Sequence, residues 1–236
     1  MSDAIEIQAR NFIDRQISTT RKALPGTPEI GSLDSRGGLD VAFTARWAVP
    51  LWYSDTDPGT DPDSDLYKLK IEYHLGVNRR GDRMAVRRSK YSITVGNAPA
   101  LRYEYEAGNT SAPMAHIHIH GVGGLLSPGL MRNAQSSRER EKRKGDWQAL
   151  HLPVGGARYR PSLEEFLYFT IRECGFRGRD GGLKYLEQQR DLWRRSQVEP
   201  VVRDYPDEAV DALRGLGYSI ERPHGQVDTP GPHDKW

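Results

Sequence analysis

Along the first 24 residues, apolar side chains recur with the 3.6-residue period of an amphipathic helix. This stripe consists of Ile5, Ala9, Phe12, Ile13 and Ile17. The next segment, LPGTPEIG, contains two prolines and two glycines, which interrupt helices. The pattern therefore predicts an N-terminal helix over residues 1–24 that ends at this segment.

From residue 39 onward the spacing changes to two, which is the period of a strand with one buried face. In segment 65–77 the residues at odd positions from Tyr67 to Leu75 are apolar, and those between them are polar. The turn NRRGD then leads into a strand of matching length, which predicts a hairpin. Predicted strands cover residues 39–53, 65–77, 83–95, 100–106, 115–120 and 147–154. Short strands in succession favour an antiparallel sheet.

Helical periodicity returns after residue 160. Ser162 and Glu165 form a capping box at the start of the clearest helix, and Gly175 ends it. Two further helices are predicted over residues 182–197 and 206–217. We therefore expect an α+β fold, an antiparallel sheet of five to seven strands packed on one face by helices. The expected parts are an N-terminal helix (1–24), the core domain with the histidine-rich strand (39–176), a C-terminal helical extension (181–221) and a tail (222–236).

The composition limits the function classes. The formal net charge is only +2, so nucleic-acid binding would need a local patch rather than a generally basic surface. The single cysteine, Cys174, has no partner for an internal disulfide and lies in the apolar stripe of a predicted helix. No signal segment or membrane-length apolar run is present in the sequence, so we expect a soluble, cytoplasmic protein with no membrane partner.

The segment AHIHIHG holds three of the seven histidines in the chain. In a strand, Ile117 and Ile119 would face the core, and His116, His118 and His120 would line the opposite surface. The same alternation puts His74, Glu104 and His151 on the polar faces of their own strands. If these strands are neighbours, the polar side chains converge on one face. The simpler alternative is an amphipathic edge strand that uses histidine as its outward polar residue.

Metal binding is one chemistry that suits such a face. Residues two apart in a strand are about 6.6 Å apart at the backbone, so the rings of His116 and His118 can turn toward one ion. The third histidine is about 13 Å from the first, which is too far for it to join easily. A divalent metal such as zinc would then need Glu104 or His151 from another strand as a further ligand.

Metal-free phosphoryl transfer is the second chemistry. One imidazole would act as nucleophile or base and another as acid, since imidazole titrates near neutrality. Arg102, Arg158 and Arg160 would hold the phosphate charge, and His151 would be a further substrate contact.

Two charged segments are best interpreted as solvated loops. Asp61, Asp63, Asp65 and Glu72 match ligand positions of a calcium-binding EF-hand loop, but Leu66 replaces the required glycine. The basic run between Arg138 and Lys144 has residues that can contact phosphates, although such runs are commonly solvent-exposed.

The segment HIHIHGV, residues 116–122, resembles the histidine-triad signature of nucleotide hydrolases and transferases. Gly121 departs from that signature, which has a hydrophobic residue there, and the remainder of that compact domain is not visible upstream. In that family the middle histidine attacks a phosphorus atom. The resemblance assigns this role to His118.

The order of several segments is similar to that of the TumE-type toxins of bacterial toxin–antitoxin pairs. The matching pieces are LKIEYHL, LRYEYE, HIHIHG and RPSLEEFL, which together cover about Leu66 to Cys174. The long basic insertion between His120 and His151 is a departure. The resemblance implies a toxin that damages RNA or a nucleotide-bearing molecule and is silenced by a cognate antitoxin. It makes His116, His118 and His120 the reactive face, with Glu104 orienting them or accepting protons.

The sequence thus predicts a toxin-like hydrolase, a nuclease or nucleotide phosphodiesterase, that belongs to a toxin–antitoxin or defence pair. The first alternative is a non-catalytic metal-binding or regulatory interaction protein. The second is a nucleotide hydrolase of the histidine-triad kind.

Overall fold

A computed structural model describes residues 3–34, 43–52, 66–78, 81–120 and 152–221. These residues form one antiparallel sheet of seven strands, whose spatial order follows the order of the strands in the sequence. The strands are β1 (Glu29–Asp34), β2 (Phe43–Pro50), β3 (Tyr67–Val77), β4 (Met84–Val95), β5 (Ala98–Glu106), β6 (Ala115–Ile119) and β7 (Leu152–Pro153). The predicted α+β class with an antiparallel sheet is confirmed.

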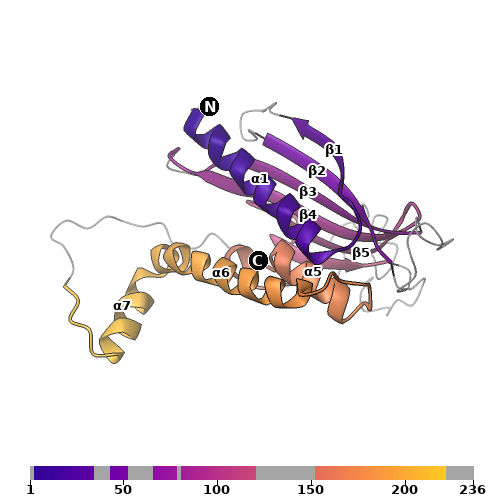
Figure 1. The fold of residues 1–236 in the computed structure, drawn as a ribbon. Coiled ribbons are helices and arrows are strands. Elements are labelled where there is room, and N and C mark those ends of the chain that lie inside the picture. Colours follow the sequence, from indigo (N-terminus) through magenta and orange to yellow (C-terminus); the bar gives the residue numbers. More distant parts are fainter. Residues whose placement is uncertain (1–2, 35–42, 53–65, 79–80, 121–151, 222–236) are drawn as a thin grey trace, which may run out of the picture.

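The described helices are α1 (Asp3–Ala23), α4 (Gly156–Tyr159), α5 (Leu163–Arg172), α6 (Gly182–Asp204) and α7 (Pro206–Gly215). Helices α1, α5 and α6 cover one face of the sheet. Helix α1 runs across the strands, α5 and α6 lie beside it, and α7 projects away at the far end of α6 (Figure 1). Residues of α1, α5 and α6 share one apolar core with β2 to β5.

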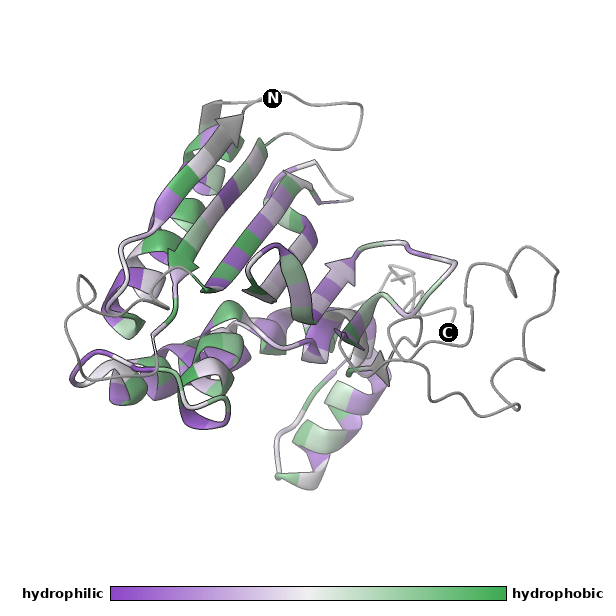
Figure 2. Ribbon diagram, turned by 90° about the vertical axis from the view of Figure 1, so that its right-hand side faces the viewer, coloured by the Kyte–Doolittle hydropathy of each residue, from purple (hydrophilic) through white to green (hydrophobic). Residues whose placement is uncertain are grey.

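The period-two pattern produces this arrangement, because it gives each strand one apolar face. Hydrophobic and hydrophilic residues alternate visibly along the strands in Figure 2. In β3, Leu69, Ile71 and Leu75 are at most 1% exposed, and they lie on the face covered by the helices. The face opposite the helices carries the polar residues of the same strands, and it therefore holds the candidate site.

Local signals set the helix boundaries. The predicted capping box is present, since the Ser162 side chain accepts a hydrogen bond from the Glu165 backbone, and the Glu165 side chain accepts one from the Ser162 backbone. Gly175 has φ 76°, a conformation that glycine adopts without strain, where the chain leaves α5. Helix α6 extends beyond the predicted end at residue 197 and includes Pro200. A proline removes one hydrogen bond without necessarily ending a helix.

Two strand predictions differ from the structure. Strand β1 begins in the last three residues of the segment that the sequence predicts as a break and continues to Asp34. It forms because its backbone pairs with β2, although its side chains are mostly polar. The last predicted strand, 147–154, is represented by the two residues of β7 in the described part of the chain. Residues 147–151 lie outside the described residues, as do the acidic loop residues Asp61, Asp63 and Asp65, the basic run and His151.

Candidate metal centre

Pairing of β5 with β6 brings the predicted site residues together. Glu104 lies directly opposite His116, and Arg102 lies directly opposite His118. Directly opposed residues in an antiparallel pair project from the same face, so the four side chains form one cluster. The sequence placed Glu104 and the histidines on polar faces of separate strands. The register shows that these faces are one and the same.

A single carboxylate oxygen faces both histidine rings. Oε2 of Glu104 lies 3.4 Å from Nε2 of His116 and 3.6 Å from Nε2 of His118. The two rings stand edge to face, with centroids 4.9 Å apart. One ligand atom from each of the three residues lies within 4.8 Å of the other two. Glu104, His116 and His118 are therefore close enough to hold one metal ion.

The tautomer of His116 follows from its other nitrogen. Nδ1 lies 2.6 Å from the backbone carbonyl oxygen of Pro113, which can only accept a hydrogen bond. Nδ1 must therefore carry a proton and donate it. In the neutral ring this leaves Nε2 with a lone pair that points toward Glu104. Such an arrangement, with a ligating nitrogen set by a hydrogen bond at the other nitrogen, is common in histidine metal ligands.

Two cations hold the other oxygen of Glu104. Nε of Arg102 lies 3.0 Å from Oε1, and Nζ of Lys90 lies 3.5 Å from the same atom. Burial alone would raise the pKa of the Glu104 carboxyl, but contacts with His116 and His118 and the charges of Arg102 and Lys90 outweigh it. The pKa consequently lies well below its ordinary value, and the side chain is a carboxylate at neutral pH.

The two distances to Oε2 of Glu104 are compatible with ligands of one tetrahedral ion. Hydrogen bonds from nitrogen to oxygen span about 2.7–3.2 Å, which is shorter than either Oε2 contact. Two ligand atoms at zinc-to-ligand distances of about 2.0–2.2 Å lie about 3.3–3.6 Å apart in tetrahedral geometry. The separations of 3.4 and 3.6 Å fall in that interval, and all three ligand atoms lie within 4.8 Å of one another. Three protein ligands would leave one coordination position for water or substrate, the layout of catalytic zinc sites.

The structure buries two of the histidines on their predicted face and exposes one of the isoleucines. His116 and His118 are only 3% and 5% exposed, although they lie on the face away from the helices. Ile117 packs against the core as predicted, but Ile119 is 41% exposed. Its partner across the strands, Leu101, is itself only half-buried, because the apolar core thins toward this end of β6. The simpler alternative, an exposed strand decorated with histidine, therefore does not describe His116 and His118.

Two other histidines lie near the cluster or share its face. The backbone N–H of His120 donates to the carbonyl of Ala100, and its ring centroid lies 6.0 Å from that of His118. His74 belongs to β3 on the same face, where its Nε2 lies 2.5 Å from Glu72. His74 therefore forms a separate histidine–glutamate pair.

Of the three predicted phosphate-binding arginines, only Arg102 lies in the cluster. Nε of Arg158 lies 2.6 Å from an Asp204 oxygen at the end of α6. The guanidinium of Arg160 lies 4.0 Å from the ring centre of Tyr105, whose side chain belongs to the helix-covered face. Lys90 was missed by sequence reasoning, because its proximity to Glu104 depends on the register between β4 and β5.

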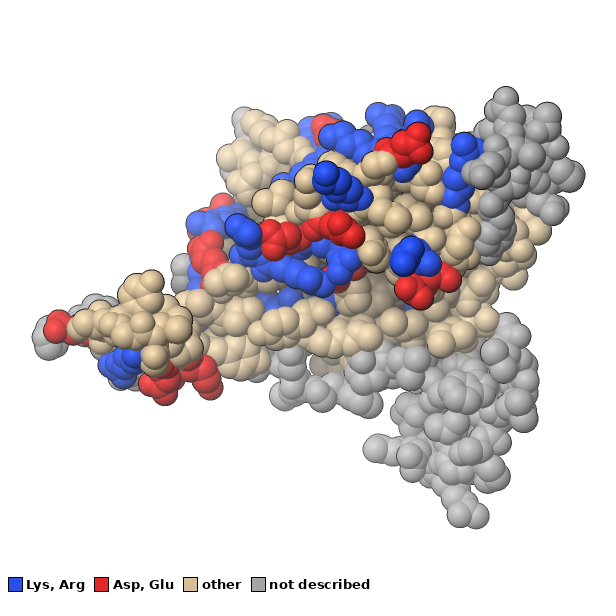
Figure 3. Space-filling model, turned by 60° about the horizontal axis from the view of Figure 1, so that its bottom comes forward, with Lys and Arg blue, Asp and Glu red and all other residues tan. Residues whose placement is uncertain are grey.

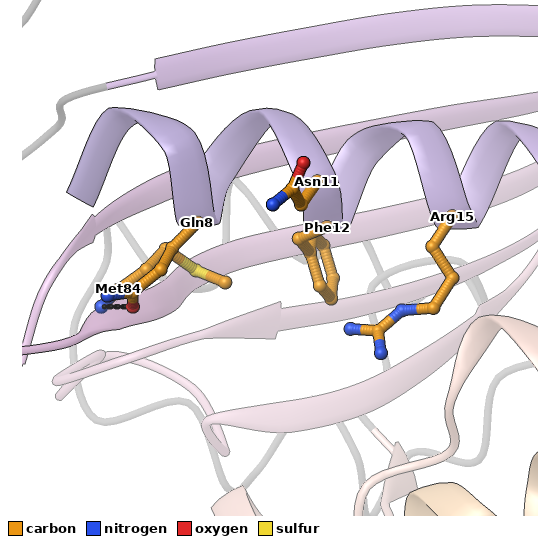
Figure 4. Close-up of a pocket in the computed structure, with 5 residues that line it drawn as sticks. All are labelled: Gln8, Asn11, Phe12, Arg15 and Met84. Atoms are coloured by element: carbon orange, nitrogen blue, oxygen red, sulfur yellow. Dashed lines mark hydrogen bonds between the residues drawn. The ribbon is translucent and has the colours of Figure 1, made fainter. Parts of the chain in front are cut away.

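A shallow pocket lies elsewhere, between α1 and β4. It has a volume of about 320 Å³ and is lined by Gln8, Asn11, Phe12, Arg15 and Met84. The Met84 backbone donates a hydrogen bond to the side chain of Gln8, which closes one end of the pocket (Figure 4). Since this pocket is on the helix-covered side of the sheet, it is not part of the histidine cluster.

No protein-family model, curated protein or solved structure matches this chain. The resemblance to TumE-type toxins therefore stays a prediction from the sequence. Within the described ranges, no helix has the length and apolar character needed to cross a membrane.

Proposed function

We propose that Glu104, His116 and His118 bind a divalent metal ion, with zinc preferred, and that the protein is a metal-dependent hydrolase of RNA or nucleotide phosphodiesters. The observation that carries the proposal is the convergence of both Nε2 atoms on Oε2 of Glu104 at 3.4 and 3.6 Å. Two imidazoles and one carboxylate are a ligand set that zinc uses in hydrolases. The toxin role in a toxin–antitoxin pair rests on the sequence resemblance and is part of the same proposal.

The chain's own residues have distinct tasks in this hydrolysis. A bound zinc ion would supply a water of lowered pKa. Arg102 and Lys90 orient Glu104 and place positive charge where a phosphate would bind. The attacking water would lose one proton to solvent as it bonds to phosphorus, and the bond from phosphorus to the leaving oxygen would break. His120, whose ring centroid lies 6.0 Å from that of His118, would give a proton to the leaving oxygen.

Metal content tests the first part of the proposal. The purified protein should carry about one zinc ion per chain, since the structure supports one three-ligand site. Glu104→Gln and His118→Ala should abolish stoichiometric binding. His74→Ala is the matched control, because His74 also contacts a glutamate on the same sheet face. Equal metal content in all four proteins would overturn the metal assignment.

Growth and turnover test the second part. Expression of the wild-type chain without an antitoxin should arrest growth, and His118→Ala should relieve the arrest. The zinc-loaded protein should also hydrolyse a small chromogenic phosphodiester, and Glu104→Gln should not. Zinc binding without growth arrest or hydrolysis would overturn the enzyme assignment.

That last outcome would favour the second candidate, a non-catalytic metal-binding interaction protein. The observation in its favour is the burial of His116 and His118, which are 3% and 5% exposed. Structural metal sites are closed, whereas catalytic sites keep one position open to substrate. Exchange of the fourth ligand for added cyanide or imidazole would distinguish an open site from a closed one.

A further inference from the structure

A row of polar residues leads away from the metal centre across three strand boundaries. Lys70 of β3 is paired with Ser92 of β4, Ser92 with Arg102 of β5, and Arg102 with His118 of β6. Neighbouring strands are about 4.8 Å apart, so the row extends about 14 Å from His118. It lies on the face opposite the helices, since the neighbours of these residues along each strand include core residues such as Leu69, Ile71 and Ile93.

This row lies in a region with more cations than carboxylates, because Arg102 and Lys90 share the single carboxylate of Glu104 and Lys70 adds a further positive charge. It contains the cations Lys70 and Arg102, separated by the buried hydroxyl of Ser92, and no carboxylate. Lys70 is exposed, and within the described segments no carboxylate lies within ion-pair distance of it. Arg102 uses its Nε atom toward Glu104, and a guanidinium has four further N–H donors.

The adjacent row of residues on the same sheet face has a different pattern of charge. It consists of Arg46, Glu72, Lys90, Glu104 and His116, across β2 to β6. Its charges alternate in sign and pair with one another, at 3.1 Å between Arg46 and Glu72 and at 3.5 Å between Lys90 and Glu104. Each cation of this row faces a carboxylate of the same row, and Glu104 faces Arg102 as well. The excess positive charge lies on the side of Lys70 and Arg102.

Another face of the molecule carries charges of both signs, unlike the row from Lys70 to Arg102. Lys and Arg side chains lie among Asp and Glu side chains over the surface shown in Figure 3. Arginines of α6 take part in such pairs: Arg194 lies 2.7 Å from Glu165, and Arg195 lies 2.8 Å from Asp191. Charges of mixed sign give little attraction to a polyanion.

We propose that the Lys70–Ser92–Arg102 row is a track for the phosphate backbone of a nucleic-acid strand, and that it delivers one phosphodiester of that strand to the metal centre. The inference rests on the proposed function and narrows its substrate class from nucleotides in general to a polymer. A mononucleotide bound at the metal centre would not reach Lys70, about 14 Å away at the strand spacing. A nucleic-acid backbone presents further phosphates at that distance.

The side chains of this face also indicate that the protein would contact the backbone of the polymer rather than its bases. The outward positions of β2 to β6 in the described chain hold no Phe, Tyr or Trp on which bases would stack. Recognition through lysine and arginine contacts to phosphate is independent of base sequence and strongly weakened by salt. Single-stranded and duplex nucleic acids offer the same backbone chemistry, so both belong in the test.

The track is tested by fluorescence anisotropy with labelled oligonucleotides of about 12 nucleotides, as single-stranded RNA and as RNA duplex. Lys70→Gln should weaken binding about three- to tenfold and reduce the slope of log affinity against log salt by about 1. Lys184→Gln is the matched control, because Lys184 is an exposed lysine of α6 on the helical side. The form that binds more tightly identifies the natural backbone.

Hydrolysis of the small chromogenic phosphodiester separates this inference from the proposed function. Lys70→Gln should leave that rate unchanged, since Lys70 contacts neither the ligands nor a small substrate. Unchanged oligonucleotide binding by Lys70→Gln, with the small-substrate rate intact, would overturn the track alone. Equal affinity of the wild-type protein for a mononucleotide and for the oligonucleotide would also overturn the track. Lys70-dependent oligonucleotide binding by a protein that lacks metal and small-substrate turnover would support the track and overturn the proposed hydrolase.

Discussion

Nδ1 of His116 and the carbonyl oxygen of Pro113 are 2.6 Å apart, and this contact fixes which nitrogen of the ring is available to a metal. Because the acceptor is a backbone atom, it persists in any side-chain variant of the cluster. We expect the neutral ring to carry its proton on Nδ1 and to bind metal through Nε2. Long-range ¹⁵N–¹H NMR of the metal-free protein reports the tautomer. A neutral ring protonated on Nε2 would contradict the geometry.

Arg102 should tune the metal affinity without being a ligand. Its Nε atom lies at an ion-pair distance of 3.0 Å from Oε1 of Glu104, while Oε2 faces the histidines. Replacing a residue that orients a metal ligand costs about 10- to 100-fold in affinity, so Arg102→Gln should weaken zinc binding by that factor. Competition with a chromogenic chelator measures it. Arg46→Gln, which removes the similar ion pair with Glu72, should leave the affinity unchanged.

Glu164 should make stability depend on pH. It is 5% exposed in α5, and burial raises the pKa of its carboxyl above the ordinary value, with only partial compensation from hydrogen bonds and Arg15. The folded state therefore binds the proton more tightly than the unfolded state does. The stability that Glu164 contributes is complete below its ordinary pKa and is lost as pH rises through the raised value.

The variant Glu164→Gln cannot ionise, so it should melt at a higher temperature than the wild type at neutral pH. The two melting temperatures should converge as the pH falls below the ordinary pKa of glutamate. Thermal unfolding followed by circular dichroism over a pH series gives both values. Glu173→Gln, at an exposed position of the same segment, should follow the wild-type curve. A larger stabilisation in acid than at neutral pH would refute the expected sign.

Leu167 should be a principal contributor to stability. It is fully buried between α5 and the sheet, so Leu167→Ala leaves a cavity and should lower the free energy of unfolding by about 2–5 kcal/mol. Leu192→Ala, at a position that is 58% exposed on α6, should change it by less than about 0.5 kcal/mol. Urea unfolding of the three proteins measures the difference.

Periodicity predicted the parts of this fold that local chemistry controls. The alternation in β3 and β5 identified the buried faces, and the Ser162–Glu165 capping box located the start of α5. Strand β1 was missed, because its backbone pairing leaves no apolar alternation in the sequence. Backbone hydrogen bonds stabilise a strand whatever its side chains are, so side-chain patterns cannot reveal every strand.

The three candidate metal ligands were predictable from the sequence, but their arrangement and their charged neighbours were not. Alternation assigned Glu104 and the histidines to polar faces, and the pairing of β5 with β6 joined those faces. The positions of Lys90 and Arg160 depend on register and on the path of the chain after β7, which no local pattern encodes. The near-complete burial of His116 is likewise a property of the assembled protein.

The three proposed ligands belong to a single hairpin that runs from Glu104 to His118. Closing a short loop costs less conformational entropy than joining distant segments, so this hairpin can form before the remaining strands are in place. A metal ion bound at that stage would hold β5 and β6 in their final register. The free energy of metal binding would then contribute to the free energy of folding. Replacement of a ligand would then slow the assembly of the sheet as well as remove the reactive centre. Cells short of the metal would accumulate a slowly folding chain rather than an inactive folded one.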